Sequence, residues 1–155
     1  MEPSQLTDAA ELPPQRELSL YLHVPFCTVK CDYCDFFSLA GVAPVRMEES
    51  AEATAGDLER LLPTTLAPGA PVPTVYVGGG TPSVLPDESL RMLLRKVAAS
   101  LPTAPREWTV ELNPETLTPE TLDILAEAGV ELGAGGEQSL RGAQLRSQGR
   151  AGRWQ

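Results

Sequence analysis

The sequence predicts a parallel α/β fold, namely part of a (β/α) barrel with about three to four βα units. Three β-rich segments lie at 17–24, 74–77 and 108–112, and a helical pattern follows each of them. Such segments, each leading into turn residues, are typical of βαβ units with a parallel sheet. A closed eight-unit barrel needs more than about 200 residues. Because the chain has 155 residues, we expect a partial barrel.

The chain divides into three parts by composition. Residues 1–16 are acidic, contain proline and lack periodicity, so we expect a flexible leader. Residues 17–130 carry the strand and helix patterns and form the predicted folded part. Residues 131–155 depart from these patterns, because the segment 131–137 is rich in glycine and has little β propensity where a fourth strand is due. We therefore expect a divergent tail, truncated or frameshifted, that offers the third strand no partner.

The first two βα units are marked by apolar alternation and by proline and glycine. Leucine and valine alternate with other residues along 17–24, and Pro25 ends this strand. The helix that follows is expected over Val45 to Leu62, closed by Pro63. The second strand, 74–77, runs directly into a glycine run, where the backbone is expected to turn sharply.

The two later helices have clear boundaries and apolar stripes. Asp87 is expected to cap a helix that ends near Ser100. Its apolar residues at helical spacing are Leu90, Leu93, Leu94 and Val97. After the strand 108–112, Thr118 as N-cap, Pro119 at the first helical position and Gly129 past the end frame a third helix. Its inward residues are expected to be Leu122, Leu125 and Ala126.

Charge and hydropathy exclude several classes of function. The 12 basic and 21 acidic residues give a net charge of −9, which repels phosphate backbones, so we expect no nucleic-acid partner. No apolar run approaches the about 18–20 residues of a membrane span. The first sixteen residues lack the apolar core of a secretory signal. These features favour a cytoplasmic protein.

The three cysteines of the chain form a C-x3-C-x2-C motif at Cys27, Cys31 and Cys34, directly after the first strand. An odd number of cysteines in a reducing compartment argues against a disulfide framework. Three thiolates on one loop suit a [4Fe–4S] cluster whose fourth iron stays open, and that iron could take the amino and carboxylate groups of S-adenosylmethionine. The alternatives are a zinc site completed by His23 and three inert cysteines. His23 itself is interpreted as a hydrogen-bonded structural residue at a strand end.

Two further features fall at the ends of the second and third strands. Gly78, Gly79, Gly80 and Thr81 lack bulky side chains, so a ligand could approach the backbone closely, although a plain turn also explains them. Glu111 is expected as an unpaired acid at the mouth of the site, able to bind ribose hydroxyls or an ammonium group. A solvated acid is the alternative. Functional groups gather at the carboxyl ends of parallel strands, where the cysteines also lie.

Three motifs in order resemble a known family. The segments YLHVPFCTVKCDYCDF at 21–36, VGGGTPS at 77–83 and VELNPETLT at 110–118 are similar to the radical S-adenosylmethionine family of oxygen-independent coproporphyrinogen III oxidase-like proteins. Within that family, Asp35 directly after the third cysteine resembles the heme chaperone branch. The oxidase branch carries a further cysteine at this place.

The resemblance implies a set of site residues. Cys27, Cys31 and Cys34 would be the cluster ligands. The contacts to S-adenosylmethionine would be Tyr21, Tyr33, Gly79, Gly80, Thr81, Glu111, Gln138 and Arg150. Here Gln138 lies in a Gly136–Ser139 segment at the spacing of the family's next motif, and Arg150 falls where the family has a cofactor-binding arginine.

The resemblance also implies a function. We expect a heme chaperone-like protein that binds the cluster, S-adenosylmethionine and heme, receives electrons from a donor and hands heme to an acceptor protein. The alternatives are oxidative decarboxylation of coproporphyrinogen III in porphyrin biosynthesis and a truncated product without function. His23 is the only histidine, and no heme ligand is assigned.

Overall fold

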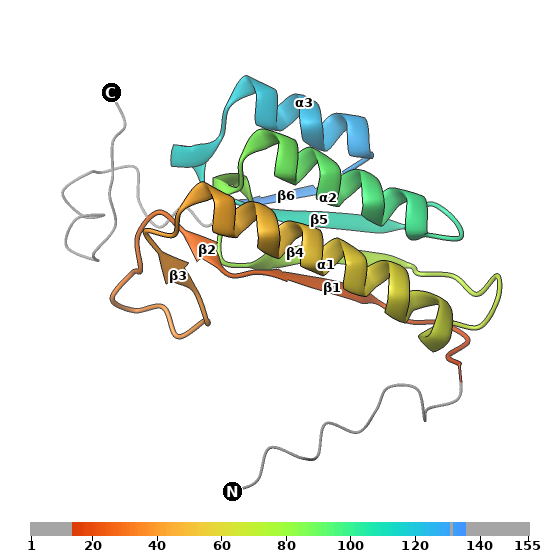
Figure 1. Cartoon of the computed structure of the whole chain (residues 1–155). Helices are drawn as coiled ribbons and strands as arrows, with labels where there is room; N and C mark the ends of the chain where they lie inside the picture. Colours follow the sequence, from red (N-terminus) through yellow and green to blue (C-terminus); the bar gives the residue numbers. More distant parts are fainter. Residues whose placement is uncertain (1–13, 131, 136–155) are drawn as a thin grey trace, which may run out of the picture.

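The computed structural model describes residues 14–130 and 132–135, and its main feature is a four-stranded parallel sheet (Figure 1). The strand order is β1-β4-β5-β6. These strands are β1 (Leu20–Val24), β4 (Thr74–Gly79), β5 (Glu107–Leu112) and β6 (Leu132–Gly135). A short parallel pair, β2 (Phe26–Cys27) and β3 (Leu39–Ala40), lies at the base of the cysteine loop. The predicted parallel α/β fold is confirmed.

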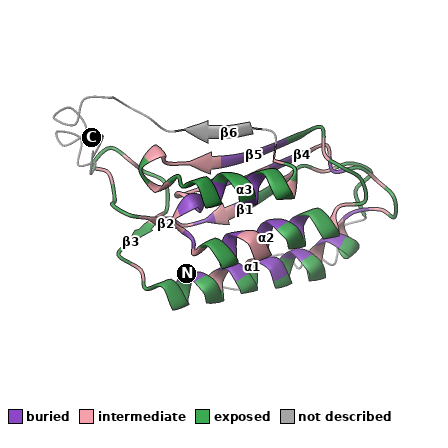
Figure 2. Cartoon of the chain, turned by 90° about the horizontal axis from the view of Figure 1, so that it is seen from above, coloured by how far each residue is buried: buried purple, intermediate pink, exposed green. Residues whose placement is uncertain are grey.

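Three helices cover one face of this sheet, as Figure 1 shows. They are α1 (Pro44–Thr65), α2 (Asp87–Ser100) and α3 (Pro119–Ala128), with short 3₁₀ turns η2 (Pro82–Val84) and η3 (Pro114–Thr116). α2 packs between α1 and α3. Its predicted stripe is fully buried, at Leu90, Leu93, Leu94 and Val97. Buried and exposed residues alternate along α1 and α2 in Figure 2, as expected of helices with one face in the core.

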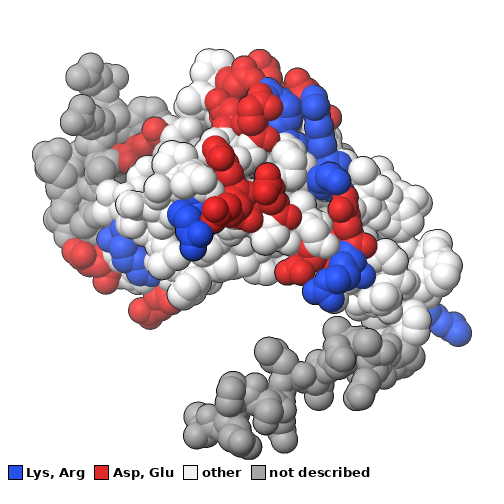
Figure 3. Space-filling view, viewed as in Figure 1, with Lys and Arg blue, Asp and Glu red and all other residues white. Residues whose placement is uncertain are grey.

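Charged side chains of both signs lie over the helices on the outer surface (Figure 3). Arg91 of α2 is paired with Glu120 and Glu127 of α3, and Lys96 Nζ of α2 lies 2.6 Å from Glu59 Oε1 of α1. The Lys96–Glu59 pair is about half exposed, and exposed pairs contribute about 0–1 kcal/mol each; the Arg91 side chain is 16% exposed, but its partners Glu120 and Glu127 are about half exposed. The apolar interior therefore does most to hold the helices on the sheet.

The alternation of side chains along the strands defines a second, polar face. In β1, Leu22 and Val24 are buried beneath the helices, whereas Tyr21 is 55% exposed and His23 is half-buried. Successive side chains of a strand point to opposite faces. Parallel pairing aligns Tyr21 with Tyr76 of β4. The face away from the helices thus carries aromatic and ionisable groups at neighbouring positions.

Two expected helix boundaries, the end of α1 and the N-cap of α2, differ from the sequence prediction. α1 continues through Pro63 to Thr65, because the burial of Leu62 and Leu66 outweighs the hydrogen bond that a proline loses in the last turn. Asp87 is the first helical residue of α2 and Pro86 is its N-cap, without a side-chain capping bond. The expected end of α1 at Leu62 was therefore wrong by three residues, and the expected N-cap of α2 at Asp87 was wrong by one.

The frame of α3 is confirmed, but of its three expected inward residues only Leu125 is buried. Thr118 accepts a hydrogen bond from the Thr121 backbone N–H, and Gly129 ends the helix in the left-handed region with φ of +81°. Thr121, Ile124 and Leu125 are buried, whereas Leu122 is 50% exposed and Ala126 is also exposed. The large Ile124 and Leu125 set the rotation of the helix, which turns Leu122 and Ala126 outward.

A fourth strand forms where the sequence predicted none. β6 pairs in parallel with β5, with Thr109 opposite Leu132 and Leu112 opposite Gly135. The row of backbone donors and acceptors along β5 binds this glycine-rich segment despite its low β propensity. The expectation of an unpartnered third strand was therefore wrong. At the other end of the fold, Gln15 exchanges backbone hydrogen bonds with Thr65 and Ala67.

Candidate functional site

The carboxyl ends of β1, β4 and β5 bring the predicted site residues together on the polar face. Glu111 lies near the end of β5, and its carboxylate accepts two hydrogen bonds from β4. The Tyr76 hydroxyl donates to Oε1 at 2.7 Å, and the Gly79 backbone N–H donates to Oε2 at 2.8 Å. The prediction of an unpaired acid was therefore wrong. Tyr76 was missed at the level of the sequence, although its place two residues before Gly78 on the same strand face was a usable signal.

The Tyr76–Glu111 contact changes the acidity of the phenol. The hydrogen bond to Glu111 is the main cause, with burial and the carboxylate charge adding to it, and together they raise the pKa of Tyr76 to about 12. Burial, and secondly the charge of Glu111, also raise the pKa of Tyr21. Both phenols are therefore neutral hydrogen-bond donors at physiological pH.

His23 links β1 to the cysteine loop. Its Nε2 lies 3.1 Å from the Phe37 carbonyl oxygen, and its Nδ1 lies 3.1 Å from the Tyr21 hydroxyl. Because a carbonyl oxygen can only accept, Nε2 carries a proton and donates to Phe37, while Nδ1 is hydrogen-bonded to the Tyr21 hydroxyl. The Tyr21 ring also stacks on Tyr76, with centroids 6.0 Å apart. His23 is hydrogen-bonded at the strand end, as expected, and both its ring nitrogens are engaged, which disfavours the zinc alternative.

The glycine run makes room for protein groups. A Cβ on Gly78 would lie 2.6 Å from the Glu111 carboxylate, and one on Gly79 would lie 2.1 Å from His23 Nδ1. A Cβ on Gly80 would meet the Phe26 carbonyl oxygen at 2.6 Å. Gly79 also has φ of +101°, which side-chain-bearing residues rarely adopt. Each glycine thus allows a close approach, and at Gly79 the space is taken by the imidazole.

The glycine run is in contact with the cysteine loop. The Gly80 N–H donates to the Val24 carbonyl at 2.9 Å, and the Thr81 N–H donates to the Phe26 carbonyl at 2.7 Å. The Thr81 hydroxyl also lies 3.7 Å from Cys27 Sγ. The end of β4 is therefore fixed against the segment that carries the first cysteine.

The three cysteines are free thiols and half-buried. Cys27 ends β2, and the Cys34 N–H donates to the Cys31 carbonyl at 3.1 Å, which closes a turn between the last two. Within residues 14–130 and 132–135, no three His, Cys, Asp or Glu side chains are close enough together to hold a metal ion. The donor set still fits a cluster, because soft thiolates are the ligands that iron–sulfur clusters use and a loop can bring them together.

Hydrogen bonds hold the part of the cysteine loop that follows Cys34, and the loop exposes the Tyr33 ring. Lys30 Nζ donates to the Phe36 carbonyl and, at 3.1 Å, to the Ser38 hydroxyl. Tyr33, one of the implied cofactor contacts, is exposed on this loop. Gln138 and Arg150, the other two contacts implied beyond the sheet, lie outside the described residues.

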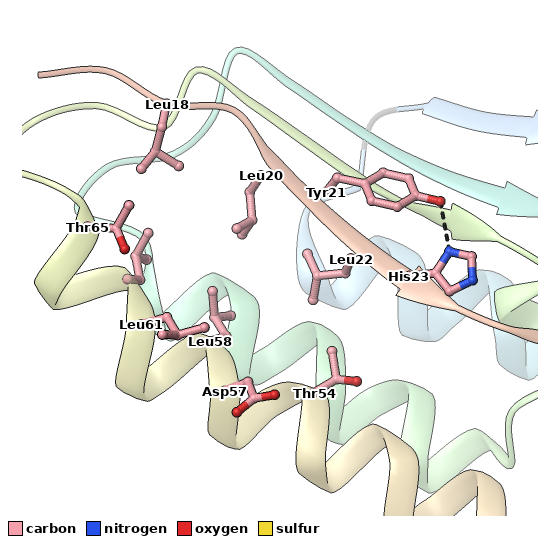
Figure 4. A pocket seen from close by; sticks show the side chains of 11 residues that line it. Leu18, Leu20, Tyr21, Leu22, His23, Thr54, Asp57, Leu58, Leu61 and Thr65 are labelled. Carbon is pink, nitrogen blue, oxygen red and sulfur yellow. Dashed lines mark hydrogen bonds between the residues drawn. The ribbon is translucent and has the colours of Figure 1, made fainter. Parts of the chain in front are cut away.

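An apolar groove of about 350 Å³ runs between β1 and α1 (Figure 4). Leucines from both elements line it, and the Tyr21–His23 pair lies at one end. Thr54, Asp57 and Thr65 of α1 add further polar atoms. The groove borders the site through Tyr21 and His23, but the glycine run and the cysteines do not line it. In the described part of the chain, no helix is long and apolar enough to span a bilayer.

The fold and this arrangement at the strand ends define a class of protein. The chain matches the model of the Radical SAM superfamily over residues 21–140, and it belongs to that superfamily. The heme chaperone HemW of Escherichia coli (strain K12) is 38% identical over 141 residues, which cover 90% of this chain and 36% of that protein. HemW of Mycobacterium tuberculosis (strain ATCC 25618 / H37Rv) is 40% identical over 144 residues, covering 89% of this chain and 35% of the relative.

Oxygen-independent coproporphyrinogen III oxidases are also similar. The enzyme of Paracoccus denitrificans (strain Pd 1222) is 33% identical over 132 residues, which cover 84% of this chain and 29% of that protein. The structure of coproporphyrinogen III oxidase (HemN) from Escherichia coli, described as a radical SAM enzyme, aligns with a TM-score of 0.71 and 25% identity over 94% of this chain and 33% of that one. These findings confirm the family resemblance and the partial barrel. The chain spans about a third of the length of the curated relatives it matches.

Proposed function

We propose that the chain binds a [4Fe–4S] cluster through Cys27, Cys31 and Cys34, binds S-adenosylmethionine beside it, and acts in a heme chaperone that passes heme to an acceptor protein. Membership of the Radical SAM superfamily supports the two cofactors. The contact between Thr81 and Cys27 is the structural observation that carries the proposal, because it fixes the glycine run of β4 directly beside the first cysteine. When bound, the cluster supplies an open iron and an electron for S-adenosylmethionine.

The chain's own residues provide an acidic and an aromatic wall for this cofactor. Glu111 offers carboxylate lone pairs to an ammonium group or to ribose hydroxyls, while Tyr76 and Gly79 hold its two oxygens. Tyr21, which precedes the cysteines in sequence, and Tyr33, which lies between Cys31 and Cys34, offer exposed rings. We extend the proposed cofactor contacts to Gly80, Thr81, Gln138 and Arg150 by their match to the family motifs.

Asp35 supports the chaperone function over the oxidase function. Asp35 follows Cys34 directly and is exposed. In the family that the motifs resemble, the oxidase branch carries a further cysteine at this place. Several similar proteins are named heme chaperone HemW. We therefore expect heme binding and transfer without decarboxylation of coproporphyrinogen III.

Anaerobic reconstitution tests the cluster. The protein is expected to take up iron and sulfide in the ratio of a [4Fe–4S] cluster, with its broad visible absorbance. Replacing any one of the three cysteines with alanine should remove most of it, while Thr28→Ala, an exposed position on the same loop, should not. Stoichiometric zinc without sulfide would refute the cluster.

Two further assays separate the candidate functions. Heme titration followed by transfer to apo-heme proteins tests the chaperone, and incubation with coproporphyrinogen III, reductant and S-adenosylmethionine tests the oxidase. Heme binding without protoporphyrinogen formation is expected. Formation of protoporphyrinogen would replace the chaperone proposal with the enzyme.

A further inference from the structure

We propose that Tyr76 is a positioning residue that fixes the Glu111 carboxylate in its ligand-binding orientation before any ligand arrives. The inference rests on the proposed function only in naming the ligand, a cationic and hydroxyl-bearing cofactor such as S-adenosylmethionine. The hydrogen bond from Tyr76 to Glu111 is present in the chain without any ligand. None of the sequence motifs assigned a role to this tyrosine.

The carboxylate of Glu111 is held at both oxygens by two different groups of β4. Oε1 accepts from the Tyr76 hydroxyl at 2.7 Å, and Oε2 accepts from the Gly79 N–H at 2.8 Å. The missing side chain of Gly78 leaves room for the carboxylate, since a Cβ there would lie 2.6 Å from it. Each carboxylate oxygen can accept a further hydrogen bond, so both stay available to a ligand.

Tyr76 is itself fixed. It lies in the middle of β4, half-buried, and its ring stacks on Tyr21 with an interplanar angle of 22°. Tyr21 in turn is hydrogen-bonded to His23, and His23 is hydrogen-bonded to the Phe37 carbonyl of the cysteine loop. A rigid phenol held by a strand and a stacked ring can hold a carboxylate in one orientation. A carboxylate held only by Gly79 would keep more freedom, which a ligand would have to remove on binding.

The energetic consequence is a loss of affinity when only the hydroxyl is removed. A hydrogen bond to a charged group is among the stronger ones in proteins. Tyr76→Phe keeps the stacked ring and deletes that bond. We expect the dissociation constant for S-adenosylmethionine to rise about tenfold, which corresponds to about 1.4 kcal/mol.

The experiment has one arm with the cofactor and one without. In the first, S-adenosylmethionine is titrated into the anaerobically reconstituted protein and its Tyr76→Phe variant. Thr74→Val is the matched control, because it deletes a hydroxyl at the other end of the same strand, where Thr74 donates to Ser19 at 2.6 Å. Tyr76→Phe should weaken binding about tenfold, Thr74→Val should leave it unchanged, and Tyr76→Phe should have no effect in a Glu111→Gln background.

The second arm follows phenolate absorbance during alkaline titration of the protein without cofactor. One of the three tyrosines should ionise with a pKa of about 12, Tyr76→Phe should remove that transition, and Glu111→Gln should bring it down toward the ordinary value of 10. If Glu111→Gln leaves the tyrosine titration unchanged, the positioning role is refuted. Equal affinity of the wild type and Tyr76→Phe also refutes it. If the wild type binds no S-adenosylmethionine but its Tyr76 still has a raised pKa, the proposed function is contradicted and the Tyr76–Glu111 hydrogen bond is not.

Discussion

Gly79→Ala tests whether the glycine run is required by the packing of the site. Two costs are expected. The backbone at φ of +101° strains any side-chain-bearing residue by about 1–2 kcal/mol. The new Cβ would lie 2.1 Å from His23 Nδ1 and 2.9 Å from the Tyr21 hydroxyl, so the imidazole has to move and its two hydrogen bonds are lost. At about 0.5–1.5 kcal/mol for each bond, this adds about 1–3 kcal/mol.

The free energy of unfolding should therefore fall by about 2–5 kcal/mol, measured by urea denaturation with an unchanged m-value. Gly69→Ala is the matched control, because Gly69 also has a positive φ, +74°, but among the described residues other than its chain neighbours none lies within 4 Å of the point that its Cβ would occupy. It should show the strain cost alone, about 1–2 kcal/mol. Equal losses for the two variants would refute the reasoning that His23 occupies the space beside Gly79.

Three further outcomes follow from burial and acidity. Leu93→Ala, at a fully buried position of α2, should lower the free energy of unfolding by about 2–5 kcal/mol, whereas Leu122→Ala on the exposed side of α3 should change it by less than about 0.5 kcal/mol in chemical denaturation. Because the folded-state pKa of Tyr76 is raised to about 12, stability should decline as pH rises from 10 toward 12, and Tyr76→Phe should reduce that decline in denaturation curves. Val77→Ala should cost about 0.5–3 kcal/mol in the same assay, since Val77 is fully buried in β4.

The fold was predictable where local signals agreed with packing. The stripe of α2 and the frame of α3 by Thr118 and Gly129 are both present in the structure. The signals failed where tertiary contacts overrode local preference. Pro63 lies inside α1 because buried leucines flank it, and the glycine-rich β6 forms because β5 offers an unpaired edge. A short segment alone shows neither that the last turn of a helix is buried nor that a neighbouring strand has free backbone groups to pair with.

The site was predictable in its location but not in its contacts. Parallel βαβ order places the strand ends at one edge, so the positions of Glu111, Gly79 and the cysteines followed from the topology. The pairing of Glu111 did not, because it depends on the register that brings β4 beside β5. The sequence also could not show that the space beside Gly79 is filled by His23, since these residues are far apart along the chain.

These contacts give the glycine run a role that a turn alone would not need. If Gly78, Gly79 and Gly80 served only to reverse the chain, a Cβ at each would meet no side chain or backbone of the described residues within 4 Å, as at Gly69 and Gly129. Instead each would collide with a different group: the Glu111 carboxylate, the His23 imidazole and the backbone of Phe26. The run therefore draws three parts of the fold together at one strand end. The glycine run therefore contacts both Glu111 of β5 and the segment that leads into the cysteine loop. A substitution at these glycines should disturb the positions of both.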